Sequence, residues 1–183
     1  MKPCFLTLSV TLFLAAGVGA QQTPATYTLV TGVQRTYETV KRNLLAAAEQ
    51  MPEADFGFRP ADGSRTYGQL FTHVASAQFS RCAGIRAETN PHQGVDLEAA
   101  LTAKAEIVEV LRDSFAFCDP AYASLTEANQ NDLVQGAGWQ RNSQVTRGFA
   151  LADNVTHDNE MSGTVAVYMR LKGMVPPSTA VSQ

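Results

Sequence analysis

Apolar residues recur three and four positions apart along four long stretches of the chain. This spacing places apolar side chains on one face of an α-helix, so each stretch predicts an amphipathic helix. Four long helices with no convincing strands predict an all-α protein, and specifically a four-helix bundle. The four stretches are residues 28–50, 65–88, 97–125 and 146–172.

The residues at the ends of these stretches support the predicted boundaries. Ser64 or Thr66 can cap the start of the second helix, and Asp96 can cap the third. The fourth helix is expected to end at Lys172, because Gly173 can adopt the left-handed conformation that often follows a helix. The pattern therefore predicts helices with defined starts and ends.

Two other features interrupt the helical pattern. Between the first two helices lies "MPEADFGFRPADG", and its Phe56 and Phe58 are expected to plug one end of the core. Within the third stretch, Pro120 is expected to bend the helix or to end its regular part.

A long polar connection separates the third and fourth helices. Residues 126–145, "TEANQNDLVQGAGWQRNSQV", have no sustained period and are rich in Asn, Gln and Gly. Such a segment predicts a loop that includes short extended pieces. Its single tryptophan, Trp139, either lines the mouth of a pocket or covers one end of the core.

The first twenty residues have the composition of a secretory signal peptide. In "MKPCFLTLSVTLFLAAGVGA" a lysine precedes an apolar run, and small residues stand before a cleavage point after Ala20. We expect residues 1–20 to be removed, although an uncleaved anchor is the alternative. Residues 21–183 would then form a single domain in the periplasm or outside the cell, with no stable membrane insertion.

Charge and cysteine content limit the environment and the partners of the protein. The net charge of −3 and the scattered arginines and lysines argue against nucleic acid as a partner. Cys82 and Cys118 would remain after cleavage. In an exported chain they can form a disulfide, but two small apolar core residues are the alternative reading.

A cluster of possible metal ligands surrounds His157 in "THDNEMSG". Residues three and four positions away share a helix face with it, namely Asp153, Asn154, Glu160 and Met161. On the second helix, His73 lies on the apolar side and is the natural facing partner. A hydrogen-bonded histidine in the core is the alternative for each.

Imidazoles together with carboxylates are the ligands that zinc, nickel and ferrous iron prefer. Such ions are held in bundle cores by side chains from facing helices. Near an ion, Glu160 would act as a ligand or as the general base, and Asp153 as a ligand or as a group that orients an imidazole.

Two segments of the chain resemble the DinB-like superfamily, and particularly its exported bacterial branch. They are "RPADGSRTYGQLFTHVASA" and "DNVTHDNEMSGTVAVYMRLKGMVPPST", and the likeness extends over nearly the whole of residues 21–183. The resemblance implies a four-helix bundle with up-down-down-up connectivity that is often dimeric. It also implies a divalent metal bound by three histidines, one from the second helix and two from an H-x-x-x-H pair on the last.

The resemblance places the first two ligands on His73 and His157, and the third on Met161, where the sequence departs from the pattern. A thioether is a poor ligand for zinc or nickel. Characterised relatives include metal-dependent thiol S-transferases, which leads to two hypotheses. The first is an exported divalent-metal-dependent hydrolase or group (thiol) transferase that acts on a small molecule, with Glu160 or Asp153 replacing the third histidine. The second is a non-catalytic, small-molecule-binding or stress-related bundle that has lost the metal.

Overall fold

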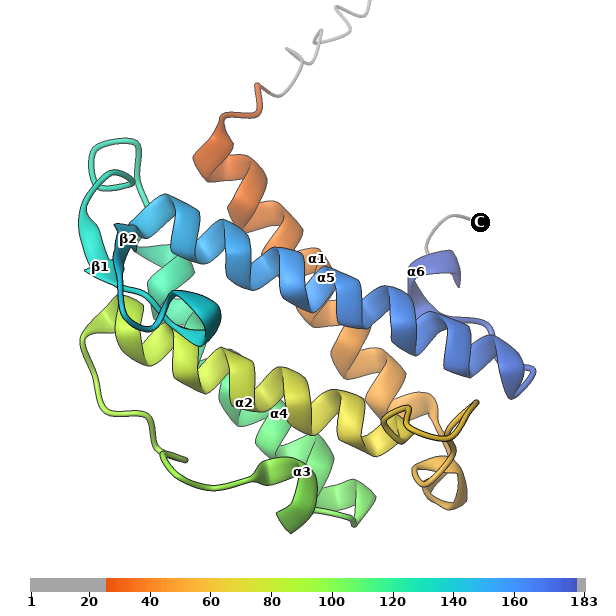
Figure 1. Ribbon diagram of the computed structural model, residues 1–183. Coiled ribbons are helices and arrows are strands. Elements are labelled where there is room, and N and C mark those ends of the chain that lie inside the picture. Colours follow the sequence, from red (N-terminus) through yellow and green to blue (C-terminus); the bar gives the residue numbers. More distant parts are fainter. Residues whose placement is uncertain (1–25, 181–183) are drawn as a thin grey trace, which may run out of the picture.

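The computed structural model describes residues 26–180, and the predicted signal peptide lies outside this part of the chain. The described chain is mostly helical, with one small two-stranded sheet (Figure 1). Its helices are α1 (Leu29–Gln50), α2 (Tyr67–Arg86), α3 (Leu97–Ala100), α4 (Lys104–Ala123), α5 (Arg147–Leu171) and α6 (Pro177–Ala180). The strands are β1 (Leu133–Gln135) and β2 (Gln144–Thr146), and short 3₁₀ turns lie at Glu53–Asp55 and Gly138–Gln140.

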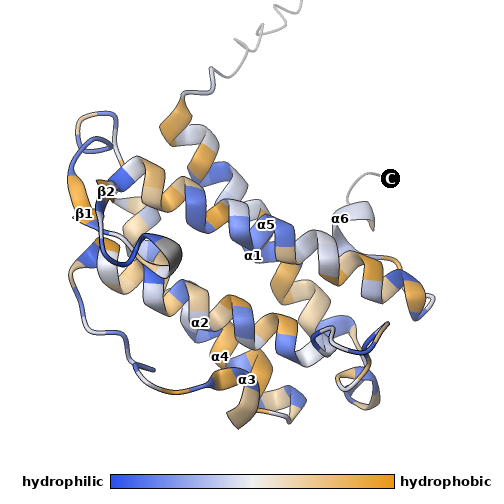
Figure 2. Ribbon diagram, viewed as in Figure 1, coloured by the Kyte–Doolittle hydropathy of each residue, from blue (hydrophilic) through white to orange (hydrophobic). Residues whose placement is uncertain are grey.

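The four long helices pack around one hydrophobic core. The most extensive contact joins α2 to α4, the next joins α1 to α5, and α2 also packs along α5. Apolar and polar residues alternate along each long helix, as expected for a helix with one buried face (Figure 2). The side chains at the centre of the core are large and fully enclosed, and include Tyr37, Leu44, Tyr67, Phe71, Leu111, Phe115, Leu151 and Met169.

Threonine side chains start three of the long helices. Thr28 accepts a hydrogen bond from the Thr31 amide, and Thr146 accepts one from the Phe149 amide. Thr66 accepts from the Gln69 amide while the Gln69 side chain bonds back to Thr66, so Thr66 and not Ser64 caps α2. These bonds satisfy amides that have no partner within the helix.

The ends of the first and last long helices also agree with the predictions. Gly173 follows α5 with a φ of 73°, the left-handed conformation expected there. Beyond α1, the ring of Phe56 meets Tyr67 edge-on and that of Phe58 meets Tyr168. The expectation that these phenylalanines close one end of the core is confirmed.

The prediction of one continuous helix from Asp96 is wrong, because the chain breaks between α3 and α4. Asp96 does cap a helix, but α3 ends after one turn and Leu101 is extended, with φ −112° and ψ 124°. Leu101 is partly buried against the core. Lys104 then starts α4 and donates to the carbonyls of Glu49 and Met51 at the end of α1. The break thus lets Leu101 pack inward while α4 begins against α1.

Pro120 does not end the helix in which it lies, since α4 continues to Ala123. A proline removes one backbone donor, and near the end of a helix this affects only the last turn. The alternative in which Pro120 ends the regular helix is therefore wrong.

The connection between α4 and α5 contains the extended pieces that were expected. Strands β1 and β2 pair antiparallel, with Leu133 opposite Thr146 and Gln135 opposite Gln144. The hairpin lies on the C-terminal end of α2, so closely that a Cβ on Gly84 would be 2.7 Å from the Gln135 carbonyl oxygen. The side chain of Trp139 is outside the described part of the structure, so its role stays a prediction.

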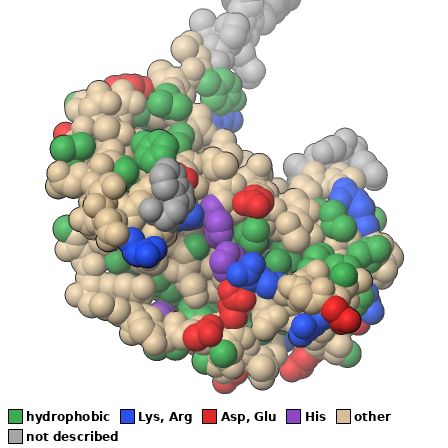
Figure 3. Space-filling model, viewed as in Figure 1, with side chains coloured by type: hydrophobic (Ala, Val, Ile, Leu, Met, Phe, Trp, Pro, Cys, Tyr) green, Lys and Arg blue, Asp and Glu red, His purple; other side chains and the backbone are tan. Residues whose placement is uncertain are grey.

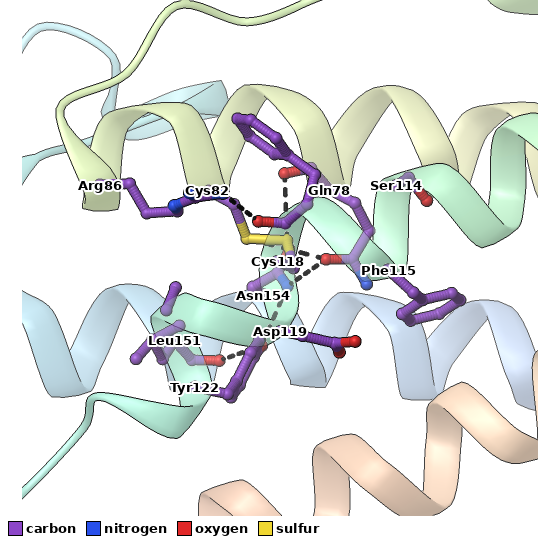
Figure 4. Close-up of a disulfide and its surroundings, with 12 residues drawn as sticks. Gln78, Cys82, Arg86, Ser114, Phe115, Cys118, Asp119, Tyr122, Leu151 and Asn154 are labelled. Carbon is purple, nitrogen blue, oxygen red and sulfur yellow. Dashed lines mark hydrogen bonds between the residues drawn. A yellow bond between two sulfur atoms is a disulfide. The ribbon is translucent and has the colours of Figure 1, made fainter.

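A disulfide joins two of the long helices. Cys82 on α2 and Cys118 on α4 are bonded, with Cα atoms 5.4 Å apart, and both are fully buried (Figure 4). Of the two alternatives for this pair, the bridge is the one the structure has. Among residues 26–180, no helix combines the length and apolar character needed to cross a membrane.

Candidate functional site

Helices α2 and α5 bring His73 and His157 into direct contact. Their Nε2 atoms lie 3.2 Å apart, and their ring centres are 5.1 Å apart. The two side chains are 28% and 16% exposed, so solvent reaches the pair. Histidine side chains are visible at the surface of the face shown in Figure 3, with acidic and basic side chains beside them. The predicted facing of His73 and His157 is confirmed.

A carboxylate lies next to the Nδ1 atom of each imidazole. The Nδ1 atom of His73 is 2.8 Å from Oε1 of Glu98, whose other oxygen accepts from Nε of Arg65 at 2.9 Å. On the other ring, Nδ1 of His157 is 3.5 Å from Oδ1 of Asp158. Carboxylates in these positions favour the tautomer with a proton on Nδ1, since a carboxylate can only accept.

With the protons on both Nδ1 atoms, each Nε2 atom has a lone pair directed at the other ring. Two lone pairs 3.2 Å apart repel unless a proton or a metal cation lies between them. Burial lowers the pKa of His73, and the nearby charge of Arg65 lowers it further against the opposing effect of Glu98. Because the lowered pKa disfavours a proton on His73, a metal cation is the more suitable positive charge for the space between the two rings.

Asp158 belongs to a chain of buried polar side chains that runs inward from the histidines. Gln78 on α2 donates to Asp158 at 2.8 Å, and the amide of Asn154 donates to Oε1 of Gln78 and to the hydroxyl of Tyr122. The Tyr122 hydroxyl in turn donates to the carbonyl of Leu151 (Figure 4). The side chains of Asp158, Asn154 and Gln78 are completely buried. Such a network fixes the side chains that compose it.

Burial raises the pKa of Asp158, and nearby His157 and Arg81 oppose this rise. Desolvation disfavours the charged form of a carboxyl group, whereas adjacent positive charge favours it. The carboxylate is thus held in an apolar interior by its neighbours, and it gains from positive charge on the His157 side.

The other residues predicted around His157 have different environments. Asp153 forms an ion pair with Arg81 of α2, with 3.4 Å between Oδ2 and Nη2. Glu160 is exposed, and among the described residues its carboxylate has no hydrogen bond or ion pair. Asn154 is in the buried network, and Met161, at the position of the third histidine, is packed in the core at 9% exposure.

The sequence pattern did not single out Glu98, Asp158 and Gln78. Glu98 lies on α3, which the helical pattern merged with α4, so its place beside His73 depends on the unpredicted break. Asp158 directly follows His157, and adjacent residues of a helix do not face each other, so the helical spacing gives no signal for this pair. The available signal was an aspartate and a glutamine on predominantly apolar helix faces, where a buried polar residue requires a partner.

The pair fits two positions of a metal site but not a third. Two nitrogens each bound about 2.0–2.1 Å from a tetrahedral zinc lie roughly 3.3 Å apart, close to the 3.2 Å between the two Nε2 atoms. The carboxylates behind the rings are also typical of metal-binding histidines. Within residues 26–180, however, no group of three or more His, Cys, Asp or Glu side chains is arranged to hold an ion.

The fold and the site together define a mostly helical protein in which two imidazoles, each next to a carboxylate, lie between α2 and α5. A model of the DinB superfamily matches residues 36–160, more than half of the chain. The chain belongs to the DinB superfamily.

Solved structures share this fold. A conserved protein from Enterococcus faecalis has a TM-score of 0.62 at 16% identity, and the match covers 80% of this chain and 98% of that one. A DinB-like protein from Bacillus cereus ATCC 10987 has a TM-score of 0.61 at 17% identity, covering 80% and 94%. A search of curated proteins found no match. At these identities the likeness concerns the fold alone.

Proposed function

We propose that the protein is an exported, divalent-metal-dependent hydrolase or group transferase, in which His73 and His157 bind the ion. The observation that carries the proposal is the pair of Nε2 atoms 3.2 Å apart with carboxylates at both Nδ1 atoms. An ordinary core histidine needs one hydrogen-bond partner for each ring nitrogen. Two imidazoles with their acceptor atoms converging are better explained by a shared cation.

Glu160 is the third protein group proposed to act at this site. It lies three residues after His157 on α5, and its exposed carboxylate is free of competing bonds within the described chain. Asp153 is the weaker choice, because its carboxylate already faces Arg81. Glu160 would act as a ligand in place of the missing histidine, or would take a proton from a nucleophile.

A zinc-like ion held by His73 and His157 would supply Lewis acidity to a substrate or to a water molecule. The chain's own contribution is to orient the two imidazoles. Glu98 and Asp158 hold the Nδ1 protons, and Arg65 holds Glu98 in place. Partial exposure of both rings leaves room for a small molecule to approach from solvent. These are the features that a hydrolase or a group transferase of small substrates requires.

The second candidate is a small-molecule-binding protein that has lost the metal. The observation in its favour is Met161, which is packed in the core where the family pattern has its third histidine. In that case a proton shared between His73 and His157 would relieve the repulsion of the lone pairs, and the site would have no catalytic metal.

Export is part of the proposal and rests on residues 1–20 together with the disulfide. Disulfides persist in oxidising compartments, and Cys82–Cys118 would be stable in the periplasm or outside the cell. We also infer that the four long helices follow the up-down-down-up connectivity of the bundle that the resemblance implies.

The test is the metal content of the processed protein, purified without a metal-binding tag and measured by elemental analysis. Near-stoichiometric zinc, nickel or iron in the wild type, and loss of it in His73→Ala and His157→Ala, is the expected result. His92→Ala is the matched control, because the His92 ring packs at a tilt against Phe79 and lies outside the pair. Absence of metal after dialysis against each ion would favour the second candidate.

A further inference from the structure

An arginine with an unused hydrogen-bond donor lies beside the histidine pair. Arg81 of α2 faces Asp153 of α5, and His73 faces His157 between the same two helices; this contact between α2 and α5 is called the seam. Asp153 precedes His157 by four residues, so the two positions are about 6 Å apart along α5. The charge of Arg81 also opposes the rise in the pKa of Asp158 that burial causes.

The guanidinium group is incompletely bonded. Its Nη2 atom is 3.4 Å from Asp153, a long contact for an ion pair, while its buried Nη1 atom has no hydrogen-bond partner in the described part of the chain. The side chain of Arg81 is only 14% exposed. A buried donor without a partner is costly, and arginine is suited to binding carboxylate or phosphate through two parallel hydrogen bonds.

The charges around the seam do not by themselves attract an anion, so in metal-free protein the anion would be held by the Nη1 donor that has no partner among the described residues. Three carboxylates, Glu98, Asp153 and Asp158, face two guanidinium groups, Arg65 and Arg81, which leaves one excess negative charge when the imidazoles are neutral. A divalent ion at the histidines would offset this negative charge, so an anionic group should bind Arg81 more tightly once the ion is present.

We infer that Arg81 is the anchor for an anionic group of the substrate, which is therefore a small molecule with a carboxylate or phosphate roughly 6 Å from its reacting group. This inference rests on the proposed function for the identity of the reacting group, but the anion subsite itself is independent of the metal. In the absence of the ligand, the carboxylate of Asp153 pairs with the guanidinium of Arg81. It therefore competes with the anionic group of the ligand. Arg81 acts in binding and orientation, not in the chemical step.

Substitutions of Arg81 and of Asp153 should have opposite effects on anion binding. Removing the charge in Arg81→Gln should abolish anion binding, whereas Asp153→Asn frees the guanidinium and should strengthen it. A purely structural ion pair would respond differently, since both changes would lower stability and neither would improve binding. Asp153→Asn is also isosteric, so it separates competition from a loss of packing.

Binding is measured with butyrate and succinate, which have the same chain length but one and two carboxylates. The first measurements use protein stripped of metal, with the backbone amide signals of α2 and α5 followed by NMR, because every variant has these signals. Both acids should bind the wild type, Asp153→Asn should bind them about five- to tenfold more tightly, and Arg81→Gln should show no saturable binding. Circular dichroism checks that each variant is folded, and Arg81→Lys serves as a charge-preserving second variant with intermediate affinity.

The same titrations on zinc-loaded protein separate this inference from the proposed function. Succinate should then bind about tenfold more tightly than butyrate, because its second carboxylate reaches the ion. If zinc does not bind but the two variants behave as described, the metal proposal fails and the anion subsite stands. Equal butyrate affinity in wild type, Arg81→Gln and Asp153→Asn would overturn the inference.

Discussion

The Nε2 atom of His73 and the Nε2 atom of His157 lie 3.2 Å apart, although each ring has a carboxylate at its opposite nitrogen. In the tautomer with both protons on Nδ1, the two rings present acceptors to the same point in space. We expect this point to be a cation site whose geometry the surrounding residues maintain.

Asp158→Asn should weaken metal binding without unfolding the protein. An asparagine amide can still accept from Gln78, but it can also donate toward Nδ1 of His157, which then favours the proton on Nε2, where the ion would bind. Loss of such a carboxylate typically lowers metal affinity 10- to 100-fold. Because burial raises the pKa of Asp158, the neutral variant should be as stable as the wild type or more stable near pH 7. Zinc titration calorimetry and urea unfolding measure the two effects; unchanged zinc affinity would contradict the role of Asp158.

Met161→His should increase metal affinity at some expense of stability. The position is one turn beyond His157 on the same helix, so an imidazole there could complete a set of three. Met161 is packed in the core, and placing a polar ring there is expected to reduce the free energy of unfolding by about 1–3 kcal/mol. Competition with a coloured chelator should reveal at least a tenfold gain in zinc affinity. Met169→His is the control, since Met169 is fully buried and lies two turns further on.

Glu160→Gln should impair metal binding or turnover, while the neighbouring exposed change Asn159→Asp should not. Both residues are exposed on α5, so neither substitution disturbs the core. If Glu160 is the third ligand, zinc affinity falls about tenfold or more; if it is the base, affinity is kept and the rate falls with a changed pH profile. Wild-type affinity together with a wild-type rate would remove Glu160 from the site.

The stability of metal-free protein should depend on pH through His73. Its pKa in the folded state is below the ordinary value of 6.5, so below that pH the unfolded chain takes up the proton first. The free energy of unfolding should therefore fall as the pH drops from 6.5 toward the folded-state pKa. In His73→Gln this contribution is absent, and the slope should be smaller. Urea unfolding between pH 7 and pH 5 checks this, and parallel curves for the two proteins would refute it.

Cys82→Ala/Cys118→Ala should destabilise the whole fold. The disulfide closes a loop across a sequence separation of 36 residues, for which the loss of loop-closure entropy predicts about 3–4 kcal/mol. Gln78 is one turn from Cys82 and donates a hydrogen bond to Asp158, which is next to His157. In the double variant, His73 and His157 should therefore also bind zinc less tightly. Thermal unfolding of oxidised, reduced and variant protein measures the first effect. Equal melting temperatures in oxidised and reduced protein would show that the bridge adds nothing.

The sequence predicted the helices well because their hydrophobic period is a local signal. Helices α1, α2 and α5 begin and end within two residues of the predicted positions, and threonine caps mark their starts. The prediction of a continuous third helix was wrong because Leu101 fits the helical spacing of apolar residues although its backbone is extended. The spacing of apolar residues shows which side chains are buried. A buried side chain between two helices therefore cannot be told from one within a helix by this spacing.

The site was predicted in part, for a related reason. The facing of His73 and His157 follows from the apolar stripes on their helices. Their carboxylate partners do not, because Glu98 reaches His73 only through the break after α3, and Asp158 is adjacent to His157 in the chain. Side-chain partners supplied by a turn, or by a neighbour on a different helix face, leave no regular spacing to detect.

Glu98, the partner of His73, belongs to a single helical turn held between two loops and not to a long helix. The segment between Ala87 and Ala103 could be exchanged for one of different length or composition, as long as buried Leu97 and partly buried Leu101 are kept to fill the core. Protein engineers could thus alter the group behind one imidazole, and with it the preference for a particular ion, by grafting a short surface segment. The cysteine bridge between α2 and α4 would keep the scaffold in place during such a replacement.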